Sequence, residues 1–442
     1  NRIAGVGSSY ESGMTVINLG GSFLSPGLID AHLHIESTLL TAPELARAIV
    51  PHATTCVIND PHEIANVLGM AGVQLMLDSF DNLPCDFFAT VPSCVPATTM
   101  ETAGAEISAQ QVRELITHPR IVGLGEMMNY PGLLEGDEEV LKKIIAAHEA
   151  GKIIDGHAPT LGGNNLQAYL GAGIYTDHEC VTLDEVKEKL EAGMHIIIRH
   201  GSATSSLSEL LPLIKHSSVG QFMFGSDDRE AGELITKGHL DELLRTAVKL
   251  GGDPLLMLRI ATINAAKHYR LYDRGALVPG FRADIAVFDN LQNFNVEMVI
   301  KNGVVVAQEG EMVVPTEQFS FPPAALNTVH LDRPLKEDDF LLTTESDQVA
   351  VIGVVPGQLV TEKILLPVRA EQKGVLKANP EEGLNKLAVV ERHKASGRLA
   401  SALIKGFGLA QGALASSVAH DSHNIIVVGV GEKAIAAAVN AL

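Results

Sequence analysis

The chain has 442 residues, a formal net charge of −20 at pH 7 and 46% hydrophobic residues. It is longer than one ordinary domain and has enough apolar residues for more than one core, so we expect two or three domains. The acidic charge without any basic run argues against binding to nucleic acid or to an anionic membrane, and no segment approaches the ~20 uninterrupted apolar residues of a membrane span.

Short apolar runs rich in Val, Ile and Phe recur along the first half of the chain, which is typical of buried strands. We predict eight strands, at 28–34, 54–59, 86–92, 121–126, 153–157, 174–178, 195–200 and 222–227. Segments of helical period separate most of them, as at 138–150, 183–192 and 239–250. Alternation of strand and helix indicates a parallel sheet, and eight such units predict an α/β fold, the (β/α)8 TIM barrel.

Two histidines lie two positions apart in Asp-Ala-His-Leu-His-Ile-Glu, at the end of the first predicted strand. In a strand this spacing places His32 and His34 on one face, and imidazole is a common metal ligand. More residues of ligand type follow the fourth, fifth, sixth and eighth strands, namely Glu126, His157, His178 and Asp227. Active sites of such barrels lie at the carboxyl ends of the strands, so the set predicts a catalytic metal centre.

The flanks of the barrel carry further strand signals. The turn at 301–303, between two valine-rich runs, is typical of a hairpin, and Pro322-Pro323 marks a boundary. We expect a small β-sandwich from 1–25 and 275–320, a barrel from 26–274 and a C-terminal α/β domain from 324–442. The chain does not begin with methionine, and we expect sequence to be missing at both ends.

Five stretches together resemble the bacterial adenine deaminase family of the amidohydrolase superfamily. They are Pro-Gly-Leu-Ile-Asp-Ala-His-Leu-His-Ile-Glu-Ser at 26–37, Asp-Pro-His-Glu-Ile-Ala-Asn-Val at 60–67, Gly-Glu-Met-Met-Asn-Tyr-Pro-Gly at 125–132, Asp-Gly-His-Ala-Pro at 155–159 and His-Asp-Ser-His-Asn at 420–424. The resemblance implies a metal-dependent aminohydrolase that converts adenine to hypoxanthine and ammonia in purine salvage. The last stretch implies that the C-terminal domain is of the adenine deaminase type.

The fourth strand has no lysine and ends in Glu126. Dihydroorotase-like and hydantoinase-like enzymes bridge their two metals with a carboxylated lysine, whereas Glu126 can bridge as it stands. The resemblance therefore implies a binuclear metal centre with the six ligands His32, His34, Glu126, His157, His178 and Asp227. This mixed nitrogen and oxygen set suits manganese, iron or zinc, and the family implies manganese or Fe(II).

Proton transfer requires further groups. Asp227 is placed to take a proton from the attacking hydroxide and to hand it to the leaving amine. Glu179, directly after His178, is the candidate that protonates a ring nitrogen, and Glu36 is the second candidate. Either carboxylate also fits a role on the surface or behind the ligands.

Ten other polar residues are candidates for substrate binding or for support of the ligands: Asp60, His62, Glu63, Arg199, His200, Ser202, His420, Asp421, His423 and Asn424. For the first three we favour support of the ligands over an additional metal site. The residues at 199–202 could contact the purine or merely cap a loop. The segment 420–424 could help to close the site or form a hydrogen-bonded turn.

Other functions stay open at this point. A cyclic-amide hydrolase lacks support because the fourth strand has no lysine, and an amino-sugar deacetylase often holds a single metal. A non-catalytic barrel subunit would usually have lost ligands, whereas another amino-purine, adenosine included, fits the same residues. Four cysteines without Cys-x-x-Cys spacing suit a reducing cytosol. We expect a cytoplasmic enzyme with a small-molecule purine substrate, no nucleic-acid or membrane partner, and a homo-oligomeric, dimeric state.

Overall fold

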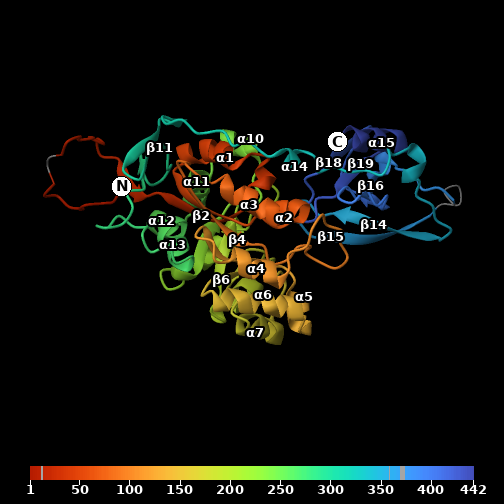
Figure 1. The fold of residues 1–442 in the computed structure, drawn as a ribbon, viewed down its shortest axis with the longest axis horizontal. Helices are drawn as coiled ribbons and strands as arrows, with labels where there is room; N and C mark the ends of the chain where they lie inside the picture. The colour runs from red at the N-terminus through yellow and green to blue at the C-terminus, as the bar shows by residue number, and fades with distance from the viewer. Residues whose placement is uncertain (11–12, 358, 369–373) are drawn as a thin grey trace. The chain divides into compact units, whose positions relative to one another are not determined.

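The computed structural model describes residues 1–10, 13–357, 359–368 and 374–442. The chain divides into two compact units, which are described separately (Figure 1). The first unit consists of Asn1–His62, Met70–Cys94 and Ile107–Ser320, and the second of Glu63–Gly69, Val95–Glu106 and Phe321–Leu442. Among the described residues, every helix is too short or too polar to cross a membrane.

The first unit contains the eight predicted strands, in chain order and parallel. Five form one sheet: β2 (Leu28–Leu33), β3 (Thr54–Asn59), β4 (Asp86–Val91), β5 (Ile121–Met127) and β6 (Ile153–Gly156). Three form another: β7 (Thr176–Asp177), β8 (His195–Arg199) and β9 (Phe222–Gly225). Past the end of β9, the backbone N–H of Asp227 donates to the carbonyl of His32 at 2.9 Å, which joins the last strand to the first. The prediction of a (β/α)8 barrel is confirmed.

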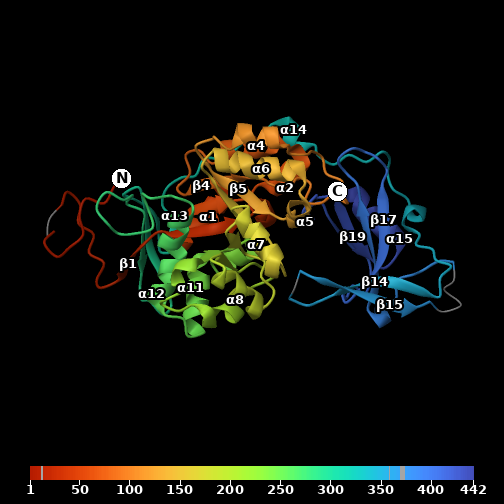
Figure 2. The ribbon, with the colours of Figure 1, turned by 90° about the horizontal axis from the view of Figure 1, so that it is seen from below.

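Helices connect the barrel strands, as Figures 1 and 2 show for α4 and α6 on the outside of β4 and β5. They are α1 (Ala42–Ile49), α3 (Met70–Asp78), α4 (Ala109–Leu115), α5 (Tyr130–Glu135), α6 (Glu138–Glu149), α7 (Gly163–Gly171), α8 (Leu183–Glu191), α9 (Leu207–Leu210), α10 (Ala231–Thr236), α11 (Leu240–Lys249), α12 (Pro254–Arg259) and α13 (Ala265–His268). Side-chain caps fix where several of them begin. Asp137 accepts the first N–H groups of α6, and Thr182 accepts one from α8.

The inside of the barrel is filled by residues two apart on the strands, because alternate side chains of a strand share a face. Ile29 and Ala31 on β2, with Cys56 and Ile58 on β3, are buried in one apolar cluster. Tyr269, which follows α13, joins this cluster and donates its hydroxyl hydrogen to the carbonyl of Ala31 at 2.7 Å. Because side chains fill the interior of the barrel, a catalytic site is expected at the ends of the strands.

The flanks of the barrel sequence build one antiparallel sheet. Its order is β1 (Phe23–Pro26), β10 (Ile285–Phe288), β11 (Val296–Lys301), β12 (Val304–Gln308) and β13 (Glu311–Met312). The predicted hairpin is present, with Asn302 and Gly303 at positive φ of 53° and 79°. The second sheet that a sandwich requires is not formed by the described residues of these flanks, since the N-terminal flank supplies one short strand instead of several.

The second unit is an α/β domain, as predicted for the C-terminal region. Its six-stranded sheet has the order β15 (Thr361–Pro367), β14 (Gln348–Val354), β17 (Leu399–Lys405), β16 (Leu384–Val390), β19 (Ile425–Gly429) and β18 (Ala413–Ser416). Helix α15 (Glu432–Ala441) packs Ile435 and Val439 against this sheet (Figure 2). The unit also includes α14 (Pro323–Leu326) and, from within the barrel sequence, α2 (His62–Leu68) apart from its first residue. Sequence patterns gave no sign that these earlier segments join the C-terminal unit.

Candidate metal centre

The six predicted ligand residues come together in the first unit. They lie in or directly after β2, β5, β6, β7 and β9, whose carboxyl ends share one end of the barrel. Groups of their nitrogen and oxygen atoms lie within 4.8 Å of one another: His32 with His34 and Glu126, His32 with His178 and Asp227, and Glu126 with His157 and His178. Five of the six residues are buried and His157 is partly exposed.

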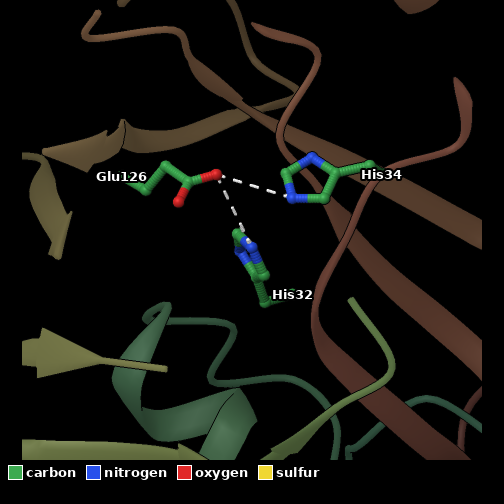
Figure 3. Close-up of side chains that lie close together, drawn as sticks. All are labelled: His32, His34 and Glu126. Atoms are coloured by element: carbon green, nitrogen blue, oxygen red, sulfur yellow. Dashed lines mark ion pairs between the residues drawn. The ribbon is translucent and has the colours of Figure 1, made fainter. Parts of the chain in front are cut away.

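The two carboxylate oxygens of Glu126 face different imidazoles. Oε1 lies 3.5 Å from Nε2 of His34 and 3.9 Å from Nε2 of His32, as the dashed lines of Figure 3 mark. Oε2 lies 2.9 Å from Nδ1 of His157 and 3.1 Å from Nε2 of His178. One carboxylate thus stands between two sets of nitrogen atoms, which is the arrangement of a bridging ligand.

Asp227 also divides its two oxygens. Oδ1 lies 3.2 Å from Nε2 of His32 and 3.7 Å from Nε2 of His34. Oδ2 pairs with the Arg199 guanidinium at 2.6 Å and accepts the backbone N–H of Asp228 at 2.8 Å. The ligand-facing oxygen is therefore Oδ1, and Arg199 holds the carboxylate in one orientation.

Charges in this cluster stabilise one another. Burial alone would raise the pKa of Glu126, but the neighbouring His178 holds it well below the usual carboxyl range. Burial would likewise raise the pKa of Asp227, and Arg199 lowers it. Burial opposes a charge on His178, yet Glu126 outweighs it and raises the pKa of His178 to about 9. Both carboxylates are therefore ionised near neutral pH and can hold a cation.

The hydrogen-bond pattern fits metal ions. Nδ1 of His34 lies 2.9 Å from the carbonyl oxygen of Asp60, which only accepts, so Nε2 is the unprotonated nitrogen of the neutral ring. That nitrogen faces carboxylate oxygens of Glu126 and Asp227. Nε2 of His32 is buried and has no hydrogen-bond partner among the described residues. Acceptors that converge in a buried space need a cation between them, and this donor set suits a divalent one.

Asp60 and His62 lie beside the ligands. Oδ2 of Asp60 accepts the backbone N–H of Glu126 at 2.9 Å, while its carbonyl oxygen faces His34. Nδ1 of His62 lies 3.4 Å from Oε1 of Glu126, and its ring meets that of His34 edge-on. These contacts agree with the predicted role of support for the ligands.

The candidates after β8 differ in their contacts. Arg199 pairs with Glu179, Asp227 and Asp228, so it belongs to the centre. His200 lies 2.7 Å from the Ser205 hydroxyl and 2.9 Å from Glu242. Ser202 donates to Glu233 at 2.8 Å and accepts the N–H of Glu230 at 2.9 Å. His200 and Ser202 therefore form hydrogen bonds with residues of neighbouring loops and helices, as is typical of residues that cap a loop.

Of the two candidates for ring protonation, Glu179 forms an ion pair with Arg199. Glu36 is partly buried in the short helical turn that follows β2.

The second unit brings Glu63 together with two of the predicted C-terminal histidines. Oε2 of Glu63 lies 3.0 Å from Nε2 of His423, and Oε1 lies 3.4 Å from Nδ1 of His420. The backbone N–H of Ala419 donates to Nδ1 of His423 at 3.2 Å, so Nε2 carries the proton of the neutral ring. Ligand atoms of Glu63, His420 and His423 lie within 4.8 Å of one another, so these contacts fit either a carboxylate–imidazole pair or an additional metal site.

The segment 420–424 is held by several polar contacts within the second unit. Asn424 donates from Nδ2 to the carbonyl of Thr102 at 2.8 Å, and Arg392 donates from Nε to the carbonyl of His423 at 2.5 Å. Asp421 lies in the same segment, next to His420. The segment is therefore an ordered turn in which His420 and His423 face Glu63.

Sequence patterns missed several buried residues that hold the ligand-bearing strand ends. Asp30 accepts the backbone N–H groups of His32 and Ser226, each at 3.1 Å, and faces His239 at 3.0 Å. Near His178, Lys189 donates to the carboxylate of Asp177, the residue directly before this histidine. Both aspartates could have been found in the sequence. Asp30 lies two positions before His32 and Asp177 lies one position before His178, each inside a predicted strand.

Comparison with known proteins agrees with the geometry. The profile of the Amidohydrolase family matches residues 23–306, and that of the Adenine deaminase C-terminal domain matches residues 358–442. An atrazine chlorohydrolase of Arthrobacter aurescens TC1, solved with zinc, aligns with a TM-score of 0.51 at 16% identity, over 71% of this chain and 90% of that one. An N-acetyl-D-glucosamine-6-phosphate deacetylase of Mycobacterium smegmatis aligns with a TM-score of 0.52 at 16% identity, over 69% and 93%. At this identity the two structures support the fold alone.

Curated relatives are much more similar in sequence. An adenine deaminase of Dehalococcoides mccartyi strain CBDB1 is 47% identical over 441 residues, which cover 100% of this chain and 76% of the relative. An adenine deaminase 2 of Carboxydothermus hydrogenoformans is 45% identical over 444 residues, with the same coverage of 100% and 76%. The chain therefore belongs to the adenine deaminase family of the amidohydrolases.

Proposed function

We propose that the protein is an adenine deaminase, a hydrolase that converts adenine and water to hypoxanthine and ammonia. The observation that carries the proposal is the position of Glu126, whose two oxygens face separate imidazole sets at the strand ends of a barrel. The similarity to adenine deaminases along the whole chain supports the same reaction.

The ligands divide into two sets. His32, His34 and Asp227 would hold one divalent ion with Oε1 of Glu126. His157 and His178 would hold the other with Oε2. We propose manganese or Fe(II), as the similarity to adenine deaminases implies, and zinc also suits the mixed nitrogen and oxygen donors. Such ions lower the pKa of a water from ~15.7 toward ~7, and so supply hydroxide near neutral pH.

The reaction requires attack at C6 of adenine and departure of its amino group. Hydroxide adds to C6, the ring nitrogens take up the displaced electron pair, and the C6–N bond then breaks to release ammonia. Asp227 accepts the proton of the nucleophile and delivers it to the leaving amine. Arg199 contacts Oδ2 of this carboxylate at 2.6 Å and keeps it in position for both transfers.

A second proton must reach a ring nitrogen. We assign this step to Glu179, with Glu36 as the alternative. Arg199 contacts Glu179 and fixes the position of its carboxylate. The proton that Glu179 delivers is the one released when water is converted to hydroxide. Glu179 and Asp227 both contact the guanidinium of Arg199, so the two proposed proton-transfer groups are held by one side chain.

The remaining candidates contribute less directly. We propose that Asp60, His62 and Glu63 support the ligands, and that His420, Asp421, His423 and Asn424 serve substrate binding. His200 and Ser202 serve the loop after β8. We further propose that the enzyme is cytoplasmic, dimeric and free of nucleic-acid and membrane partners, with the flanking sheet, barrel and C-terminal region as its domains.

The test is a spectrophotometric screen of manganese- and iron-loaded protein. Adenine, adenosine, other amino-purines and cyclic amides are offered in parallel, and ammonia is measured separately. We expect adenine to be converted to hypoxanthine with one equivalent of ammonia. Turnover of a cyclic amide without turnover of adenine would overturn the proposal.

A further inference from the structure

The barrel has a seam between β6 and β7, which carry the ligands His157 and His178 at their ends. The two barrel sheets end at these strands, and no strand pairing joins them among the described residues. The backbones nevertheless approach closely: a Cβ at Gly156 would lie 2.0 Å from the carbonyl oxygen of Thr176. The side-chain hydroxyl of Thr176 accepts the N–H of Gly156 at 2.8 Å, so side chains replace the usual backbone ladder at this seam.

A buried ammonium group spans the seam. Lys189, on α8, is fully buried, and its Nζ donates to the carbonyl of Ala158 at 2.7 Å. It also donates to Oδ2 of Asp177 at 2.6 Å and to Oε1 of Glu185 at 2.5 Å. Ala158 directly follows His157, and Asp177 directly precedes His178. One side chain is therefore bonded to the neighbour of each ligand.

The two carboxylates extend this connection to the backbone. Oδ1 of Asp177 accepts the N–H of Ala158 at 3.0 Å and that of Glu179 at 3.1 Å. Glu185 accepts the N–H of Thr160 at 2.7 Å and that of Val181 at 2.9 Å. Both loops are thus held from two sides by charged groups whose own charges are compensated by Lys189.

We propose that Lys189 is a positioning residue that sets the spacing of His157 and His178, and so governs the affinity of the second metal position. Nδ1 of His157 and Nε2 of His178 lie 3.2 Å apart, a separation that two ligands of one ion require. The first position does not depend on this lysine, because Asp30 holds the strand ends of His32 and Asp227 through the N–H groups of His32 and Ser226. The inference rests on the proposed metal-dependent function.

The experiment compares Lys189→Met with Lys301→Met. Lys301 is a matched control: it is buried in the flanking sheet, and its Nζ lies 2.6 Å from both Asp86 and Asp284. Removing Lys189 leaves Asp177 and Glu185 without their buried cation, so a clear loss of stability is expected. Removing Lys301 is milder, because Asp86 keeps its pairs with Arg274 and Arg282 and Asp284 keeps its pair with Arg282. Glu185→Gln is a milder second variant, because it keeps an acceptor oxygen and the lysine.

Manganese binding is measured by titration of the metal-free proteins in competition with a chelator. We expect two ions per chain for the parent and for Lys301→Met. For Lys189→Met we expect one tight ion, and a second that binds about 10- to 100-fold more weakly, as is typical when a group behind a metal ligand is removed. Turnover should recover at high manganese concentration. Glu185→Gln should show a smaller shift at the same position.

The possible outcomes distinguish a failure of the positioning role of Lys189 from a failure of the proposed two-metal centre. If Lys189→Met binds two ions as tightly as the parent and differs only in melting temperature, the positioning role is wrong. If Lys189→Met does not fold, the manganese titration of Glu185→Gln decides. A weaker second ion supports the positioning role, and binding as tight as in the parent contradicts it. If the parent itself binds fewer than two ions, the proposed centre fails, whatever the variants do.

Discussion

Replacement of Glu126 by glutamine tests the bridging role directly. Glutamine has nearly the same shape, but it has one acceptor oxygen and no charge. The carboxylate presents Oε1 to His32 and His34, and Oε2 to His157 and His178, at distances of 2.9–3.9 Å. The amide can serve one of these sets, and its NH2 group would face the other.

The size of the effect follows from the charge. Opposite unit charges about 4 Å apart attract by about 4 kcal/mol at an effective dielectric constant of about 20. A loss of this size weakens ion binding by about a thousandfold, at about 1.4 kcal/mol for each factor of ten. The set that faces the NH2 group also loses an oxygen ligand, so we expect Glu126→Gln to retain one ion at most.

The assay is metal analysis after gel filtration, together with adenine turnover. The control is Glu138→Gln, whose carboxylate is exposed on α6 and pairs with Lys142 at 3.1 Å. We expect two ions and full turnover for the control, and one ion or none with little turnover for Glu126→Gln. A Glu126→Gln variant with two ions and undiminished turnover would refute the bridging role.

Three further predictions concern other parts of the chain. Asp227→Asn should keep metal, because four imidazoles and Glu126 remain, but should lose about 10²- to 10⁴-fold in turnover, as is typical of a missing general acid or base; near-normal turnover with intact metal would contradict this. His420→Ala removes an exposed imidazole beside Glu63 and should lower kcat/KM for adenine while the melting temperature changes little; an unchanged kcat/KM would leave the segment a structural turn. Burial alone would raise the pKa of Glu391, but backbone N–H groups, with that of Ser396 foremost, lower it to about 2. Its stabilisation is thus present above the ordinary pKa near 4.5, is worth up to about 3 kcal/mol at about 1.4 kcal/mol per pKa unit, and fades as pH falls toward 2. Urea unfolding of the parent and Glu391→Gln should therefore converge at low pH, and a constant difference would show that the carboxylate charge is not the cause.

The barrel and the convergence of the candidate ligands were predictable because both depend on local patterns. Each strand is an apolar run of a few residues, and in five of the eight strands a candidate ligand lies at or within a few residues of its end, as His157 does after Ile153 and Ile154. Parallel strands share an edge at their carboxyl ends, so residues in equivalent positions had to meet. The missing lysine on the fourth strand then distinguished Glu126 as the bridging candidate.

Contacts between distant segments were not predictable in the same way. Lys189 reads as an ordinary helix lysine, and its burial depends on how α8 packs over β6 and β7. The ion pair of Arg199 with Glu179 depends on the register of neighbouring strands. The flanking strands were recognised individually, but their assembly into one sheet instead of two depends on partners that a single strand does not specify.

The composition of the second unit has a consequence for how the protein is made. Asn424 donates to the carbonyl of Thr102 across a separation of 322 residues, and His423 meets Glu63 in the same unit. At a synthesis rate of about 5 to 20 residues per second, Thr102 is added to the chain roughly 15 to 65 seconds before Asn424. During that interval the segments 63–69 and 95–106 are present without the C-terminal part of their own unit. Until the C-terminal part is made, residues such as Glu63 and Thr102 lack these contacts and stay accessible to a chaperone or a protease.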